Sequence, residues 1–173
     1  MIICISGLAG SGKSAIGDIV AKRLGLRHIN FTFKDIAKQE GVDLMKMQDN
    51  ARADKKIDLD LDAKIAEEAR KGNCVVTTWL APWTIKNADL KIWLDATQEV
   101  RAKRVAPRDG MTYGGALSHI KKRDEDNHRR YISLYKIDIY DHKNFDLILD
   151  TNNLPLDRVA EEIIKLANTK KKK

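Results

Sequence analysis

The stretch that most constrains the fold of this chain is GLAGSGKS, residues 7–14. The six residues before it, MIICIS, are apolar and typical of a buried parallel strand. After it, apolar residues recur at helical spacing from Ile16 to Leu24, and Gly25 ends the predicted helix. A strand, a turn of the pattern G-x-x-x-x-G-K-[ST] and a helix together favour a loop that surrounds phosphates with backbone N–H groups.

We therefore interpret residues 7–14 as a phosphate-binding loop (P-loop) for ATP. All eight positions are expected to contact the nucleotide: Gly7, Leu8, Ala9, Gly10, Ser11, Gly12, Lys13 and Ser14. Lys13 supplies a mobile charge for the transferred phosphoryl group, and the Ser14 hydroxyl is a ligand for Mg²⁺. A plain glycine-rich turn is the alternative. The dinucleotide-binding pattern G-x-G-x-x-G does not fit, because Gly17 falls at the wrong spacing.

Three further apolar runs predict strands at residues 74–79, 90–96 and 145–151, and RHINF (27–31) is interpreted as a second, shorter strand. Helices are predicted near residues 33–41, 57–71 and 97–106, and from Leu156 onward. Strands that alternate with helices indicate an α/β fold of three layers, a parallel sheet flanked by helices. Ligands of such folds bind at the carboxyl ends of the strands.

Composition points to one soluble domain. The chain has 173 residues and a net charge of +7, of which Lys170–Lys173 supply four charges. We expect one domain over residues 1–167 and a basic, disordered tail over 168–173, with a weak nucleic-acid contact of this tail as the less favoured alternative. No apolar run reaches the ~18 residues of a membrane span. Cys4 and Cys74 lie in predicted buried strands, so we expect reduced thiols and a cytoplasmic protein without membrane contact.

Arginines concentrate in residues 101–135, which we expect to form a helical lid. Arginine binds phosphoryl oxygens through its planar fork of donors. A helix–loop–helix with Gly110, Gly114 and Gly115 at the bend would cover the P-loop and exclude water. For any single arginine, ordinary surface charge paired with a nearby acid is an equally good interpretation.

Two aspartates end apolar runs near these segments. Asp95 ends "IWLD" and has Gln98 three residues later, so the cap of the next helix is favoured over a metal–water ligand. Asp150 ends "LILD" and is interpreted as a turn residue.

In this order of segments the chain resembles the nucleoside monophosphate kinases and, more narrowly, the archaeal-type cytidylate kinases. The resemblance covers about residues 1–167. It is carried by FKDIAKQEG (33–41), KKIDLDLD (55–62), and the segments 88–110, 123–141 and 145–151. It implies a monomeric enzyme that transfers the γ-phosphoryl group of ATP to CMP or dCMP, with Mg²⁺ as cofactor.

The resemblance also implies site residues. The catalytic residues would be Lys13, Arg104, Arg123 and Arg130, with Arg108 contacting ATP. An insert over about residues 32–70 would bind the acceptor. Within it, Asp58 and Asp62 lie one helical turn apart and would accept hydrogen bonds from the amine of cytosine, although a solvated helix face is an equal alternative.

The chain departs from the family pattern at two acceptor positions. Lys34 stands where an arginine is usual, and Trp79-Leu-Ala-Pro-Trp83 stands where R-L-A-G-W is usual. We assign Lys34 and Trp79 to the acceptor site, while packing of both tryptophans in the core or under the lid is an open alternative. These departures leave two other functions open: a P-loop kinase for another small acceptor, and an ATP-binding regulatory protein without transfer activity.

Overall fold

The computed structural model describes residues 1–31, 41 and 55–170, and it has the predicted parallel sheet. The strand order is β2-β3-β1-β4-β5, and every neighbouring pair is parallel. The strands are β1 (Ile2–Ser6), β2 (Arg27–Ile29), β3 (Cys74–Val76), β4 (Leu90–Asp95) and β5 (Leu147–Asp150). Each lies within a run predicted from the sequence. Because β1 has β3 on one side and β4 on the other, the segments that follow these three strands meet at one edge.

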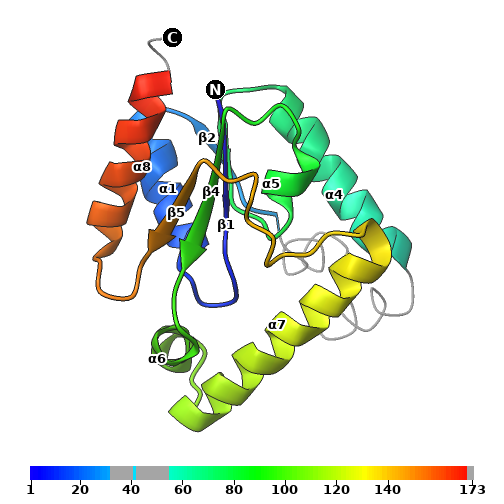
Figure 1. Ribbon diagram of the computed structural model, residues 1–173, viewed down its shortest axis with the longest axis vertical. Coiled ribbons are helices and arrows are strands. Elements are labelled where there is room, and N and C mark those ends of the chain that lie inside the picture. Colours follow the sequence, from blue (N-terminus) through cyan, green and yellow to red (C-terminus); the bar gives the residue numbers. More distant parts are fainter. Residues whose placement is uncertain (32–40, 42–54, 171–173) are drawn as a thin grey trace.

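Helices cover both faces of the sheet, which gives the three expected layers (Figure 1). The helices α1 (Lys13–Leu24) and α8 (Leu156–Lys170) cover one face, and α4 (Lys55–Arg70) and α5 (Ala81–Thr84) cover the other. Side chains of β1 alternate between the two cores: Ile3 and Ile5 face α1 and α8, whereas Ile2 and Cys4 face α4 and α5. Cys4 and Cys74 are buried free thiols, as expected.

Two more helices, α6 (Gln98–Arg108) and α7 (Tyr113–Tyr135), lie at the carboxyl ends of the strands. In Figure 1 the yellow-green α7 runs below the sheet, at the end opposite the two chain termini. Helices α6 and α7 form the helical pair predicted from the arginine-rich segment, but the glycines at the bend between them differ from the prediction. Only Gly110, with φ of +64°, lies in the connection, whereas Gly114 and Gly115 belong to the first turn of α7.

The structure corrects one predicted cap. The N-cap of α6 is Thr97, whose side chain accepts a hydrogen bond from the Val100 N–H at 3.4 Å. Asp95 instead ends β4 and is exposed, so the prediction that it caps α6 was wrong by two residues. Asp150, predicted as a turn residue, is the last residue of β5, and its carboxylate accepts a hydrogen bond from the Asn152 N–H of the following turn at 2.8 Å.

The described part of the predicted disordered tail is helical. Helix α8 continues to Lys170, so residues 168–170 are helical. The Lys170 ammonium donates to the Asp146 carboxylate at 2.8 Å, which ties the helix end to the sheet. Two predictions lie outside the described residues: the end of the tail (171–173) and the helix at 33–41, which includes Lys34 and of which only Gly41 is described. Among the helices that the structure describes, none is long and apolar enough to cross a bilayer.

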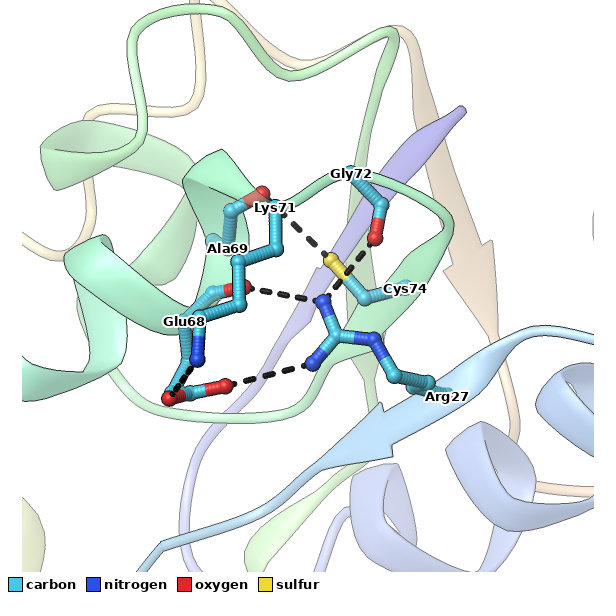
Figure 2. A network of polar contacts seen from close by, with 6 residues as sticks. All are labelled: Arg27, Glu68, Ala69, Lys71, Gly72 and Cys74. Atoms are coloured by element: carbon cyan, nitrogen blue, oxygen red, sulfur yellow. Dashed lines mark hydrogen bonds and ion pairs between the residues drawn. The ribbon is translucent and has the colours of Figure 1, made fainter.

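A polar network fixes the C-terminal end of α4 against β2 (Figure 2). The Arg27 guanidinium donates to the Glu68 carboxylate at 3.2 Å and to two carbonyl oxygens, those of Glu68 and Gly72, at 2.9 and 3.0 Å. Lys71 donates to the other oxygen of the Glu68 carboxylate at 2.6 Å. These contacts hold α4 in place, and α4 carries the two aspartates assigned to the acceptor.

Candidate active site

The P-loop connects β1 to α1 and has the conformation that its glycines allow. Gly10 has φ of +80°, and a Cβ atom there would lie 2.9 Å from both the Arg101 carbonyl oxygen and the Val105 side chain. Gly12 has φ of +91° and is the N-cap residue of α1, and no described side chain caps this helix end. The N–H groups of the first turn of α1 are therefore directed to an anion-binding position.

The second and third residues of the P-loop anchor it. Ala9 packs in an apolar cluster with α6 and α7, and Leu8 packs in a second cluster around Leu80 and Tyr131. The Ala9 N–H donates to the Asp124 carboxylate at 3.2 Å, and the Ser11 N–H donates to the Leu8 carbonyl oxygen at 3.1 Å. Sequence reasoning assigned all eight positions to ATP, but the Ala9 and Ser11 N–H groups have partners within the protein.

A buried ion pair, which sequence reasoning missed, ties the P-loop to both helices. The Arg101 guanidinium of α6 donates to the Asp124 carboxylate of α7 at 2.7 Å and to the Ala9 carbonyl oxygen at 2.9 Å. The two side chains are only 3% and 4% exposed. Nothing in the sequence separates Arg101 from its neighbouring arginines, because the pairing depends on how α6 and α7 cross.

Three cations gather beside the P-loop, and we call Lys13, Arg108 and Arg123 the cation cluster. Burial lowers the pKa of Lys13 to about 7, and repulsion from Arg123 and Arg108 contributes. Burial also lowers the pKa of Arg123, which nevertheless keeps access to solvent. Arg108 is held by a fork of two 2.7 Å hydrogen bonds to Asp109. Asp109 pairs with Arg108, and the remaining positive charge of Lys13 and Arg123 beside the P-loop suits a polyphosphate.

Arg104, assigned to catalysis from the sequence, lies between the P-loop and the segment after β5. Its guanidinium donates to the Ser11 carbonyl oxygen at 3.4 Å and to the Thr151 side chain at 3.1 Å, with a further hydrogen bond to the Thr151 carbonyl oxygen. These bonds join the P-loop to the segment after β5. The structure thus gives Arg104 partners in the protein and leaves it out of the cation cluster.

The two aspartates of α4, which we call the acid pair, face α7. An Asp58 oxygen lies 3.5 Å from the Arg130 guanidinium, and Asp62 accepts a hydrogen bond from the Tyr135 hydroxyl. Burial raises the pKa of both carboxyl groups. Asp58 is only 5% exposed, and its second oxygen, Oδ2, has no hydrogen-bond partner among the described residues. The alternative of a solvated helix face is therefore wrong for Asp58, which is buried.

Trp79 and Trp83, which lie in the segment that departs from the family pattern, have different neighbours. Trp83 packs edge-on against Trp93 and Phe145, with ring centroids 6.3 and 5.1 Å apart, in agreement with the packing alternative. Trp79 packs beside Tyr131 at 6.2 Å, and the Lys13 ammonium lies 5.1 Å from the centroid of its ring. Trp79 therefore contacts the P-loop lysine directly.

The oxygen atoms near the start of α1 suit Mg²⁺. The Ser14 hydroxyl is exposed and lies 3.4 Å from the Asn30 side-chain oxygen. Within the described ranges, no group of three or more His, Cys, Asp or Glu residues could hold a metal ion. A few neutral oxygen ligands fit Mg²⁺, because this ion keeps several waters and is bound largely through substrate phosphates.

A parallel sheet of this order with a P-loop after β1 and two helices over its carboxyl edge defines the P-loop kinase fold. Shikimate kinase from Bacteroides thetaiotaomicron has a similar structure, with a TM-score of 0.66 at 15% identity, over 97% of this chain and 98% of that one. At this identity the likeness shows the fold alone.

Sequence comparison then gives the family. The cytidylate kinase-like family matches residues 2–153. A cytidylate kinase of Pyrococcus horikoshii is 42% identical over 154 residues, 88% of this chain and 80% of that protein. Cytidylate kinase 2 of Borrelia garinii is 38% identical over 94% of each chain. The chain belongs to the cytidylate kinase-like family.

Proposed function

We propose that this protein is a cytidylate kinase, which transfers the γ-phosphoryl group of ATP to CMP or dCMP and releases ADP and the nucleoside diphosphate. Membership of the cytidylate kinase-like family supports this assignment. We further propose that the enzyme acts as a monomer in the cytoplasm, with Mg²⁺ bound together with ATP.

The observation that carries the proposal is the position of two arginines on α7. Arg123 belongs to the cation cluster beside the P-loop, and Arg130 lies next to the acid pair. Seven residues separate them, which is two helical turns, so both lie on one side of α7. One helix thus borders both a surface suited to polyphosphate and a surface suited to an acceptor with hydrogen-bond donors.

On the donor side, we assign the phosphates of ATP to the P-loop and the first turn of α1. Lys13, Arg108 and Arg123 neutralise the phosphates and the charge that develops on the transferred group. Arg104 supports the loop from outside, in keeping with its bonds to Ser11 and Thr151. Mg²⁺, held through the Ser14 hydroxyl, would supply further charge neutralisation at the phosphates.

On the acceptor side, we assign the base to the acid pair and the monophosphate to Arg130 and Arg123. The exocyclic amine of cytosine donates two hydrogen bonds, and carboxylate oxygens are its natural acceptors. The buried Oδ2 atom of Asp58 lacks a described partner, so an amine donor would remove an energetic penalty there. Uracil presents a carbonyl oxygen at the same position, which a carboxylate repels.

The chemical step is a direct in-line transfer. An oxygen of the acceptor monophosphate attacks the γ-phosphorus as the bond to the leaving ADP oxygen breaks, without a covalent enzyme intermediate. Protein groups contribute position and charge. We propose that residues 101–135 act as a lid whose closure excludes water, which would otherwise accept the phosphoryl group.

The test is an assay of ADP release with a panel of acceptors: CMP, dCMP, UMP, AMP, shikimate and gluconate. We expect turnover with CMP or dCMP and a kcat/KM for UMP at least tenfold lower, which corresponds to one good base contact. Asp58→Asn should reduce the preference for CMP over UMP. Asp60→Asn is the matched control, because Asp60 is an exposed carboxylate on the same helix.

Two results would reject the assignment. Turnover of shikimate or gluconate without turnover of CMP would support a kinase for another acceptor. ATP binding without phosphoryl transfer to any of the six compounds would support a regulatory protein.

A further inference from the structure

Trp79 is fixed in place from several directions. It follows β3, and its carbonyl oxygen accepts a hydrogen bond of 2.6 Å from the hydroxyl of Ser6, the residue directly before the P-loop. Its ring packs against the apolar cluster of α6 and α7 and lies 6.2 Å from the Tyr131 ring. The indole therefore presents a rigid face toward the loop.

Lys13 rests against this face in an unfavourable electrostatic surrounding. Its ammonium is 5.1 Å from the centroid of the Trp79 ring. Arg123 of α7 repels it, as do Arg108 and Arg101 of α6. Asp124 attracts it. Asp124 is already paired with Arg101 at 2.7 Å.

These cations would drive an unrestrained lysine side chain away from the P-loop and into solvent. A lysine with several rotatable bonds loses conformational entropy when phosphate captures it. The electron-rich face of an indole attracts an ammonium group without adding a charge, so it restrains Lys13 and leaves the site positive for an incoming polyphosphate.

We propose that Trp79 is a positioning residue for Lys13: its ring face holds the ammonium over the P-loop before ATP arrives and so strengthens polyphosphate binding. The proposal builds on the P-loop role given under the proposed function. It assigns Trp79 to the donor side of the site, whereas the sequence interpretation placed it on the acceptor side.

A double-mutant cycle tests the pair. Calorimetric titration with MgATP, with inorganic triphosphate and with CMP gives Kd for the native protein, Trp79→Leu, Lys13→Met and the double variant. We expect Trp79→Leu to raise Kd about two- to fivefold, as for one cation–π contact, and to have no effect once Lys13 is replaced. Trp79→Phe keeps a ring and should restore most of the native affinity.

A matched control removes an indole from the same segment. Trp83→Leu loses a half-buried ring that packs on Trp93 and Phe145, so its effect on Kd should be the same with and without Lys13. Thermal melting of each variant identifies any that fails to fold, and if Trp79→Leu does, Trp79→Met removes the ring in its place and completes the cycle with Lys13→Met.

Two outcomes overturn the proposal. If Trp79→Leu raises the Kd for triphosphate equally with and without Lys13, the ring only supports the fold. If it weakens CMP binding and leaves ATP unchanged, Trp79 contacts the acceptor. Failure of the native protein to bind ATP would instead reject the proposed function, which keeps the two failures distinct.

Discussion

Asp124→Ala is the substitution that most directly tests how α7 holds the P-loop. The Asp124 carboxylate accepts hydrogen bonds from Arg101 at 2.7 Å and from the Ala9 N–H at 3.2 Å. The side chains of Arg101 and Asp124 are only 3% and 4% exposed. Its removal leaves the Arg101 charge buried without a counter-ion and the Ala9 N–H without its acceptor. Breaking a buried pair of this kind costs about 3–5 kcal/mol.

Chemical denaturation measures the free energy of unfolding of this variant. For a domain of this size the loss corresponds to a Tm lower by about 6–20 °C. Asp126→Ala is the matched control, because Asp126 pairs with Arg129 on the surface of the same helix, where an ion pair contributes about 0–1 kcal/mol. A loss below about 1 kcal/mol for Asp124→Ala would refute the reasoning.

Three other substitutions have defined expectations. Gly10→Ala should lower the free energy of unfolding by about 1–3 kcal/mol and weaken ATP binding, because φ is +80° and a Cβ atom would lie 2.9 Å from α6. Gly114→Ala is the control and should not destabilise the protein, because its Cβ atom would meet nothing within 4 Å. Glu68→Gln should lower Tm at neutral pH, because the hydrogen bond from Lys71 holds the pKa of Glu68 in the folded protein below its ordinary 4.5. The stabilisation is present above pH 4.5 and is lost as the pH falls through the pKa of the folded protein. Thr97→Ala should remove the cap of α6 and cost about 0.5–1 kcal/mol in denaturant titration.

The sheet was predictable because local signals agreed. Four of the five strands lie in short apolar runs, β2 (RHI) being the exception, and β1 is followed by a motif that requires a strand before it and a helix after it. The sequence missed α5, a four-residue helix, because one turn is too short to show periodicity. It misplaced the cap of α6 because both Asp95 and Thr97 are good cap residues and sequence alone does not separate them.

Site residues were predictable where they belong to a motif and uncertain where tertiary contacts decide. Lys13 and Ser14 have defined places in the P-loop motif. The arginines illustrate the other case: Arg101 is buried and structural, Arg104 bonds to the protein, and Arg123 joins the cation cluster, although all three have similar sequence surroundings. Only the crossing of α6 and α7 separates their roles.

The proposed function depends most on one arrangement: ATP phosphates at the P-loop and a cytosine base at the acid pair, both bordered by the same side of α7. A crystal structure with a bisubstrate analogue, cytidine and adenosine joined through five phosphates, tests it directly. We expect the phosphate chain to lie over residues 7–14 within reach of Lys13 and Arg123, with the cytosine amine donating to Asp58. A phosphate chain away from the P-loop, or a base that leaves Asp58 without contact, would contradict the account.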